Sequence, residues 1–264
     1  FVPANLGQYG LNFDHFNVTS TEGSEAGRLG SRFAQNTGAI SAKGDKAGPS
    51  AAMLSTLYTL VAWDSGDLSG GTISDGLDSQ EGPDDIALLD GFLAGATPAN
   101  RRGIWLSGEG IAEDASTSDD GSRLHPFLTD TFGADLVTGN FKSLTGDPRA
   151  RIAFIPTAPW AHPTRVYGMN HGCQTLNDLL SVVSTVDGAA EAGQYEHIGP
   201  GPFTASIFRP TGAGRDFRTL IDGFDLSNLE GNFQTIADVG TKPNSDNGRI
   251  AWFDDAVSGH FQIC

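Results

Sequence analysis

Cysteine is scarce in this chain, and the spacing of the two cysteines excludes the common zinc sites. Cys173 and Cys264 are the only cysteines among 264 residues, and they form no C-x-x-C pair. In an oxidising compartment they could pair, closing a loop of about 90 residues and adding about 4 kcal/mol of stability. In the cytosol they would be free thiols. The sequon Asn17-Val18-Thr19 indicates secretion only in a eukaryote. We expect a Cys173–Cys264 disulfide.

Long apolar runs are absent as well. No stretch of about 18 consecutive apolar residues occurs, so the sequence predicts no membrane insertion. The chain does not open with a basic segment followed by an apolar one, so we expect no signal peptide in this form.

Basic residues are outnumbered two to one. The 32 acids against 16 bases give a net charge of −16. Such a charge repels phosphate backbones, so we expect no nucleic-acid partner. A solvated acidic surface is the simplest explanation of the excess, and a saline habitat or bound Ca²⁺ are the alternatives.

Apolar segments alternate with helical patterns along the chain. LYTLVAWD (57–64) is a nearly continuous apolar run, typical of a strand covered on both faces. PDDIALLDGFLAG (83–95) has a proline and two acids in its first turn, which favours a helix start. The late segments 203–210 and 217–224 indicate a β-hairpin. The order predicts a single three-layer α/β domain over residues 1–264, with a mostly parallel, flavodoxin-like central sheet and a late β-hairpin.

The first residues do not fit the usual opening of such a domain. NLGQYG (5–10) has the pattern of a helix end, and LNFDHFNV (11–18) follows it at once as an alternating strand. We therefore expect a fragment of a longer precursor that lacks the first strand.

Four segments carry a resemblance to a known family. They are LVAWDSGDLSGGTISDG (60–76), DDIALLDGFLAG (84–95), GIWLSGEGIAED (103–114) and FRTLIDGFDLSNL (217–229). Together they resemble extracellular bacterial domains of the class I glutamine amidotransferase-like, flavodoxin-like superfamily. The resemblance extends from about Leu11 to Phe261, and its motifs specify a layout of strands and loops.

The residues that would carry amidotransferase chemistry are missing. The family's catalytic cysteine falls on Leu106, which has no nucleophilic atom, and none of the six histidines is followed two residues later by glutamate. A serine elbow would need glycines where Trp105 and Glu109 stand, so Ser107 fails as a nucleophile motif. Its simpler role is to cap the helix that begins near Gly108.

Carboxylates follow two of the predicted strands. Asp64 and Asp67 come after one strand and Glu109 after the next, so all three are expected at the carboxyl edge of a parallel sheet. There they could cap helices, hold a hard cation such as Ca²⁺ or Mg²⁺, or act as an acid/base pair.

These observations favour a non-catalytic secreted or cell-surface module with a structural, adhesion or assembly role. Its expected partners are other protein subunits or cell-surface components, and no cofactor beyond Ca²⁺ is expected. The alternative is an extracellular hydrolase that uses carboxylates at the edge of the sheet, with Glu109, Asp64 and Asp67 as candidates and Ser107 as a further one.

Overall fold

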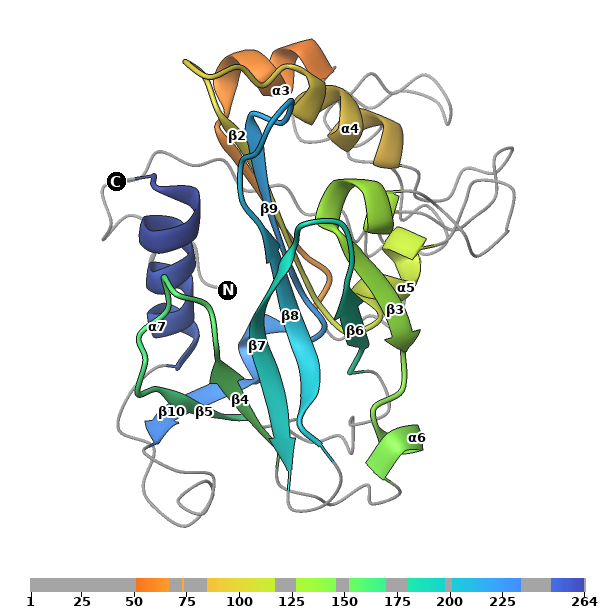
Figure 1. Ribbon diagram of the computed structural model, residues 1–264, viewed down its shortest axis with the longest axis vertical. Helices are drawn as coiled ribbons and strands as arrows, with labels where there is room; N and C mark the ends of the chain where they lie inside the picture. The colour runs from red at the N-terminus through yellow and green to blue at the C-terminus, as the bar shows by residue number, and fades with distance from the viewer. Residues whose placement is uncertain are drawn as a thin grey trace, which may run out of the picture.

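The computed structural model describes residues 51–66, 73, 85–116, 127–145, 152–169, 180–197, 201–233 and 248–263. Two β-sheets and a set of short helices make up this part of the chain (Figure 1). No helix within these ranges is long and apolar enough to cross a membrane.

The larger sheet has eight strands in the order β1-β2-β9-β8-β7-β4-β5-β10. Its parallel part contains three strands, which are β1 (Leu60–Asp64), β2 (Arg102–Ser107) and β9 (Phe217–Asp222). Every residue of β2 is buried, as expected for a strand with neighbours on both sides and cover on both faces. The parallel strands bring their carboxyl ends to one edge of the sheet.

All other pairings in the larger sheet are antiparallel. The strands are β8 (Phe203–Arg209), β7 (Ala190–His197), β4 (Ile152–Pro156), β5 (Val166–Met169) and β10 (Leu229–Phe233). In Figure 1, β4, β5 and β10 run across the direction of β7, β8 and β9, so the sheet curls into a half-barrel.

A second sheet and the helices cover the large sheet. β3 (Ala134–Thr138) and β6 (Val182–Thr185) pair antiparallel beside β8. The remaining elements are α3 (Ala51–Leu57), α4 (Ile86–Ala94), α5 (Ile111–Ser116), the π-helix η2 (Phe127–Phe132), α6 (Lys142–Thr145), the short 3₁₀-helix η3 (Leu226–Asn228), α7 (Gly248–Asp254) and the π-helix η5 (Asp255–Phe261).

The two faces of the parallel strands bury separate cores, because side chains alternate along a strand. Trp105 packs with Trp252 and Phe154 on the face covered by α7 and η5. Its neighbour Leu106 packs with Ile221 on the face covered by α4, α5 and η2.

The prediction of a flavodoxin-like three-layer fold with a mostly parallel sheet is wrong. Only β1, β2 and β9 run parallel, and the chain builds the rest of the larger sheet from antiparallel neighbours instead of helical crossovers. The late hairpin is present as β8 and β9. The strand expected over residues 11–18 lies outside the described residues.

Candidate functional site

The carboxyl ends of β1, β2 and β9 form the candidate site. Asp64 ends β1 opposite Ser107 of β2, and Asp222 ends β9 one position beyond the pair of Leu106 and Ile221. Aligned residues of neighbouring parallel strands point to the same face. Asp64, Ser107 and Asp222 therefore form a polar row on the face that also carries Trp105.

Backbone hydrogen bonds join the three loops that leave these strands. The Ser65 amide donates to the Ser107 carbonyl at 2.9 Å, and the Gly108 amide donates to the Phe224 carbonyl at 2.9 Å. The Glu109 amide donates to the Gly66 carbonyl at 3.0 Å. The loops therefore hold one another in place.

Ser107 hydrogen-bonds the end of β2 to the segment that follows β9. Its hydroxyl donates to the Phe224 carbonyl at 2.9 Å and accepts from the Leu226 amide at 3.1 Å, and the residue is buried. The predicted role as a cap of α5 is wrong, because both partners lie in the segment after β9. The hydroxyl hydrogen points at a carbonyl oxygen, which gives Ser107 no base to activate it.

Leu106, which the sequence resemblance aligned with a catalytic cysteine, is completely buried. Its side chain packs in the core with Trp63 and Ile221. The position therefore serves packing, and no reactive atom reaches the sheet edge from it.

Glu109 is completely buried, and its Oε1 accepts from Asn228 Nδ2 at 3.0 Å. Asn228 ends η3, so this contact ties the loop after β2 to the helix after β9. Asp225 begins the same helix: its carboxylate accepts from the Ser227 amide at 2.7 Å and from the Ser227 hydroxyl. Glu109 thus holds η3 against the loop after β2, and Asp225 caps the start of η3.

Asp222 lies completely buried below this edge. Its Oδ2 accepts from Trp105 Nε1 at 2.8 Å and from Trp252 Nε1 at 3.1 Å, and its Oδ1 accepts from Ser206 Oγ at 2.5 Å. Burial raises the pKa of Asp222 to about 6, against the lowering effect of these three hydrogen bonds. The sequence analysis did not select Asp222, although two tryptophans that need acceptors were visible in the sequence.

Asp64 differs from these residues because it is exposed. Its Oδ1 accepts from the Gly66 amide at 3.3 Å. Desolvation, followed by repulsion from Asp225, raises the pKa of Asp64 to about 7. Among the described carboxylic residues at this edge of the sheet, Asp64 is exposed, and the other three are buried: Glu109, Asp222 and Asp225.

The predicted cation site is not assembled in the described part of the chain. Asp67 lies outside that part, and no group of three His, Cys, Asp or Glu residues within it could hold a metal ion. Asp64 and Glu109 do lie on adjoining loops, but one is exposed and the other enclosed. Cys173 and Cys264 also lie outside the described residues, so their disulfide stays a prediction.

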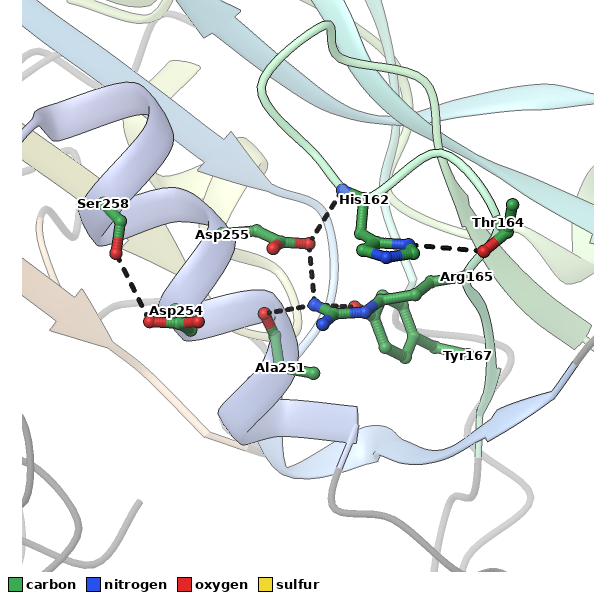
Figure 2. Close-up of polar contacts among 8 residues, drawn as sticks. All are labelled: His162, Thr164, Arg165, Tyr167, Ala251, Asp254, Asp255 and Ser258. Carbon is green, nitrogen blue, oxygen red and sulfur yellow. Dashed lines mark hydrogen bonds and ion pairs between the residues drawn. The ribbon is translucent and has the colours of Figure 1, made fainter.

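A second polar cluster fastens the loop between β4 and β5 to the C-terminal helix. Arg165 Nη1 pairs with Asp255 Oδ2 at 3.0 Å and donates to the Ala251 carbonyl at 3.2 Å, while the His162 amide donates to the same Asp255 oxygen at 3.1 Å (Figure 2). Trp160, in the same loop, packs on Trp252 with ring centroids 5.1 Å apart. These contacts fix the loop against the C-terminal helix.

Comparison with known proteins assigns no family. No protein-family model and no curated protein matches the chain. Among solved structures, similar chains include Gan42B, a GH42 beta-galactosidase from G. stearothermophilus, with 15% identity and a TM-score of 0.36 over 68% of this chain and 20% of that chain. Another is a cold-adapted beta-galactosidase from Rahnella sp. R3, with 11% identity and a TM-score of 0.39 over 76% of this chain and 22% of that one. The chain thus spans about a fifth of their length, and likeness at this level assigns neither fold family nor activity.

Proposed function

We propose that this chain is a non-catalytic module with a structural, adhesion or assembly role. The observation that carries the proposal is the use of polar side chains at the carboxyl ends of β1, β2 and β9. Ser107, Glu109, Asp222 and Asp225 are buried and bound to partners within the fold. A general acid or base must come within hydrogen-bond reach of a substrate, and these enclosed groups do not.

Exposed apolar side chains support a role in assembly. Met53 and Leu57 lie four residues apart on α3 and are 41% and 66% exposed. Residues at this spacing share one face of a helix. A position outside the cell, with protein subunits or surface components as partners, agrees with the acidic composition and belongs to the same proposal. Kinship with extracellular amidotransferase-like domains stays a hypothesis from the sequence motifs.

A hydrolase is the second candidate, and Asp64 is the observation that favours it. A carboxyl group with a pKa near 7 is half protonated at neutral pH and can give or take a proton there. The buried neighbours Glu109 and Asp225 would have to become accessible to complete an acid/base pair, which their contacts oppose.

Turnover assays separate the two candidates. We expect neither the wild type nor Asp64→Asn to hydrolyse a panel of chromogenic glycosides and esters above background between about pH 5 and pH 8. The matched control is Asp135→Asn, which makes the same change at an exposed carboxylate on β3. Hydrolysis by the wild type and by Asp135→Asn that disappears in Asp64→Asn, with circular dichroism unchanged, would replace the module with the hydrolase.

A further inference from the structure

Arginines gather at the end of the sheet opposite to the carboxylates. β2 and β9 begin at this end and β8 finishes there, and their arginines are Arg101, Arg102, Arg209, Arg215 and Arg218. The chain has only 16 basic residues against 32 acids, so this grouping runs against its overall charge.

Arg218 is held in place by neutral oxygens. Its Nη1 donates to the Phe261 carbonyl at 2.9 Å, and its Nη2 donates to Gln262 Oε1 at 2.7 Å. The side chain is nine-tenths buried, with 9% of its surface exposed. These contacts fix the guanidinium but leave its positive charge uncompensated.

Arg101 lies beside Arg218 on the same face of the sheet. Gly103 of β2 pairs with Arg218 of β9, so the two residues face the same side of the sheet. Arg101 precedes Gly103 by two residues and therefore faces that side as well. Repulsion from Arg101 adds to burial in lowering the pKa of Arg218. Arg101 is exposed, so one guanidinium of the pair is fixed and the other is open to solvent.

Arg102 adds positive charge from the opposite face. It is buried, its guanidinium donates to the Ser55 carbonyl and to Asn100 Oδ1, and its Nε has no hydrogen-bond partner. Within the described part of the chain, no carboxylate forms an ion pair with any of these three arginines, Asp216 included. Unpaired buried cations are costly, and a bound anion would offset that cost.

We propose that Arg101 and Arg218 form a binding site for a small oxyanion, a phosphate or a carboxylate, at the start of β2 and β9. The planar guanidinium of the exposed Arg101 matches the paired oxygens of both groups, and Arg218, whose Nη atoms bind Phe261 and Gln262, supplies a fixed positive charge beside it. The fixed Arg218 loses little conformational freedom on binding, and Arg102 strengthens the local positive potential. The site lies away from the carboxylates of the candidate functional site and does not depend on the proposed function.

Calorimetric titration of the purified chain with inorganic phosphate, and separately with acetate, tests the site. Chloride at equal ionic strength is the reference. We expect saturable binding of at least one of the two anions, and the preferred anion indicates whether phosphate or carboxylate ligands are meant. Arg101→Gln is expected to weaken binding about tenfold. Arg218→Lys keeps the positive charge but loses the planar guanidinium, and it is expected to weaken binding less.

Arg215→Gln is the matched control because it removes the same charge at the same end of the sheet. Arg215 packs over Phe217, which pairs with Arg102 and lies on the other face. We expect Arg215→Gln to bind as the wild type does. Binding no better than that of chloride, or equal weakening by Arg215→Gln and Arg101→Gln, would overturn the proposal.

Discussion

Replacing Gly108 with alanine is expected to lower the free energy of unfolding by about 4 kcal/mol. Gly108 has a φ of 141°, and an added Cβ would lie 1.7 Å from Ser65 Oγ and 2.9 Å from the Ser65 backbone nitrogen. The second contact cannot be relieved by turning the Ser65 side chain. The loops after β1 and β2 would have to separate, which breaks their backbone hydrogen bonds. Urea denaturation measures the loss.

Gly214→Ala is the control for the backbone conformation alone. Gly214 has a φ of 75°, and nothing lies within 4 Å of an added Cβ. We expect this variant to lose about 1 kcal/mol, the usual cost of placing alanine at a positive φ. Equal losses for the two variants would show that the loops do not approach as closely as the structure has them.

Removal of the buried Asp222 carboxylate is expected to have an effect of similar size. Asp222→Ala leaves the indole N–H groups of Trp105 and Trp252 and the hydroxyl of Ser206 without their acceptor inside the core. We expect a loss of about 4 kcal/mol in urea denaturation, with a changed near-ultraviolet circular dichroism from the two tryptophans. Asp222→Asn retains an acceptor oxygen for the indoles and is expected to lose less. A loss below about 1 kcal/mol for Asp222→Ala would mean that these hydrogen bonds are absent in solution.

The pH dependence of the same variants has a definite sign. Burial raises the pKa of Asp222 from 3.8 to about 6 in the folded protein, so the folded state holds this proton more tightly. The contribution of Asp222 to stability is therefore full below about pH 4 and is lost as the pH rises through about 6. Relative to Asp222→Asn, the wild type should lose up to about 3 kcal/mol over this range. A relative stability that rises with pH would contradict the assignment.

Local sequence patterns predicted the elements around the candidate site well. The apolar run 57–64 contains β1, and GIWLS lies in β2. The cover expected on both faces of the first strand is wrong, because β1 lies at the edge of the sheet and only Trp63 in it is buried. Leu57 belongs to α3. The helix expected from residue 83 begins at Ile86 and ends at Ala94, before Gly95. β2 and α4 have buried apolar faces, so local pattern and tertiary packing require the same structure there.

The central antiparallel strand β7 could not be predicted in the same way. β7 reads AEAGQYEH, and Gly193 lies at two register shifts against β8. Such a strand has too weak an apolar alternation to be found without its neighbours, which are β4 and β8. Residues 151–156 were expected to form a strand and form β4, but without β7 the antiparallel links between β4 and β8 could not be recognised. The parallel strands then appeared to define the whole sheet, and the flavodoxin-like fold was the wrong conclusion.

For the candidate site, too, the sequence predicted features that depend on local pattern and missed contacts between residues distant in sequence. The sequence placed Asp64, Ser107 and Glu109 at one sheet edge correctly, because parallel strands share their carboxyl ends. It missed Asp222, and it gave Ser107 the wrong role, because their partners are distant in sequence: Asp222 binds Trp105 and Trp252, and Ser107 binds residues over 100 positions later in the chain. It also missed Asp225, whose partner Ser227 is local. Hydrogen bonds over such separations depend on the assembled fold.

The free energy of unfolding of Ser107→Ala tests the central claim most directly, namely that the polar groups at the ends of β1, β2 and β9 hold the fold together. Urea denaturation should show a loss of about 2 to 3 kcal/mol, because the Phe224 carbonyl and the Leu226 amide both lose their buried partner. A variant as stable as the wild type would show that the hydroxyl is not needed by the fold and is available for chemistry, which would contradict the account.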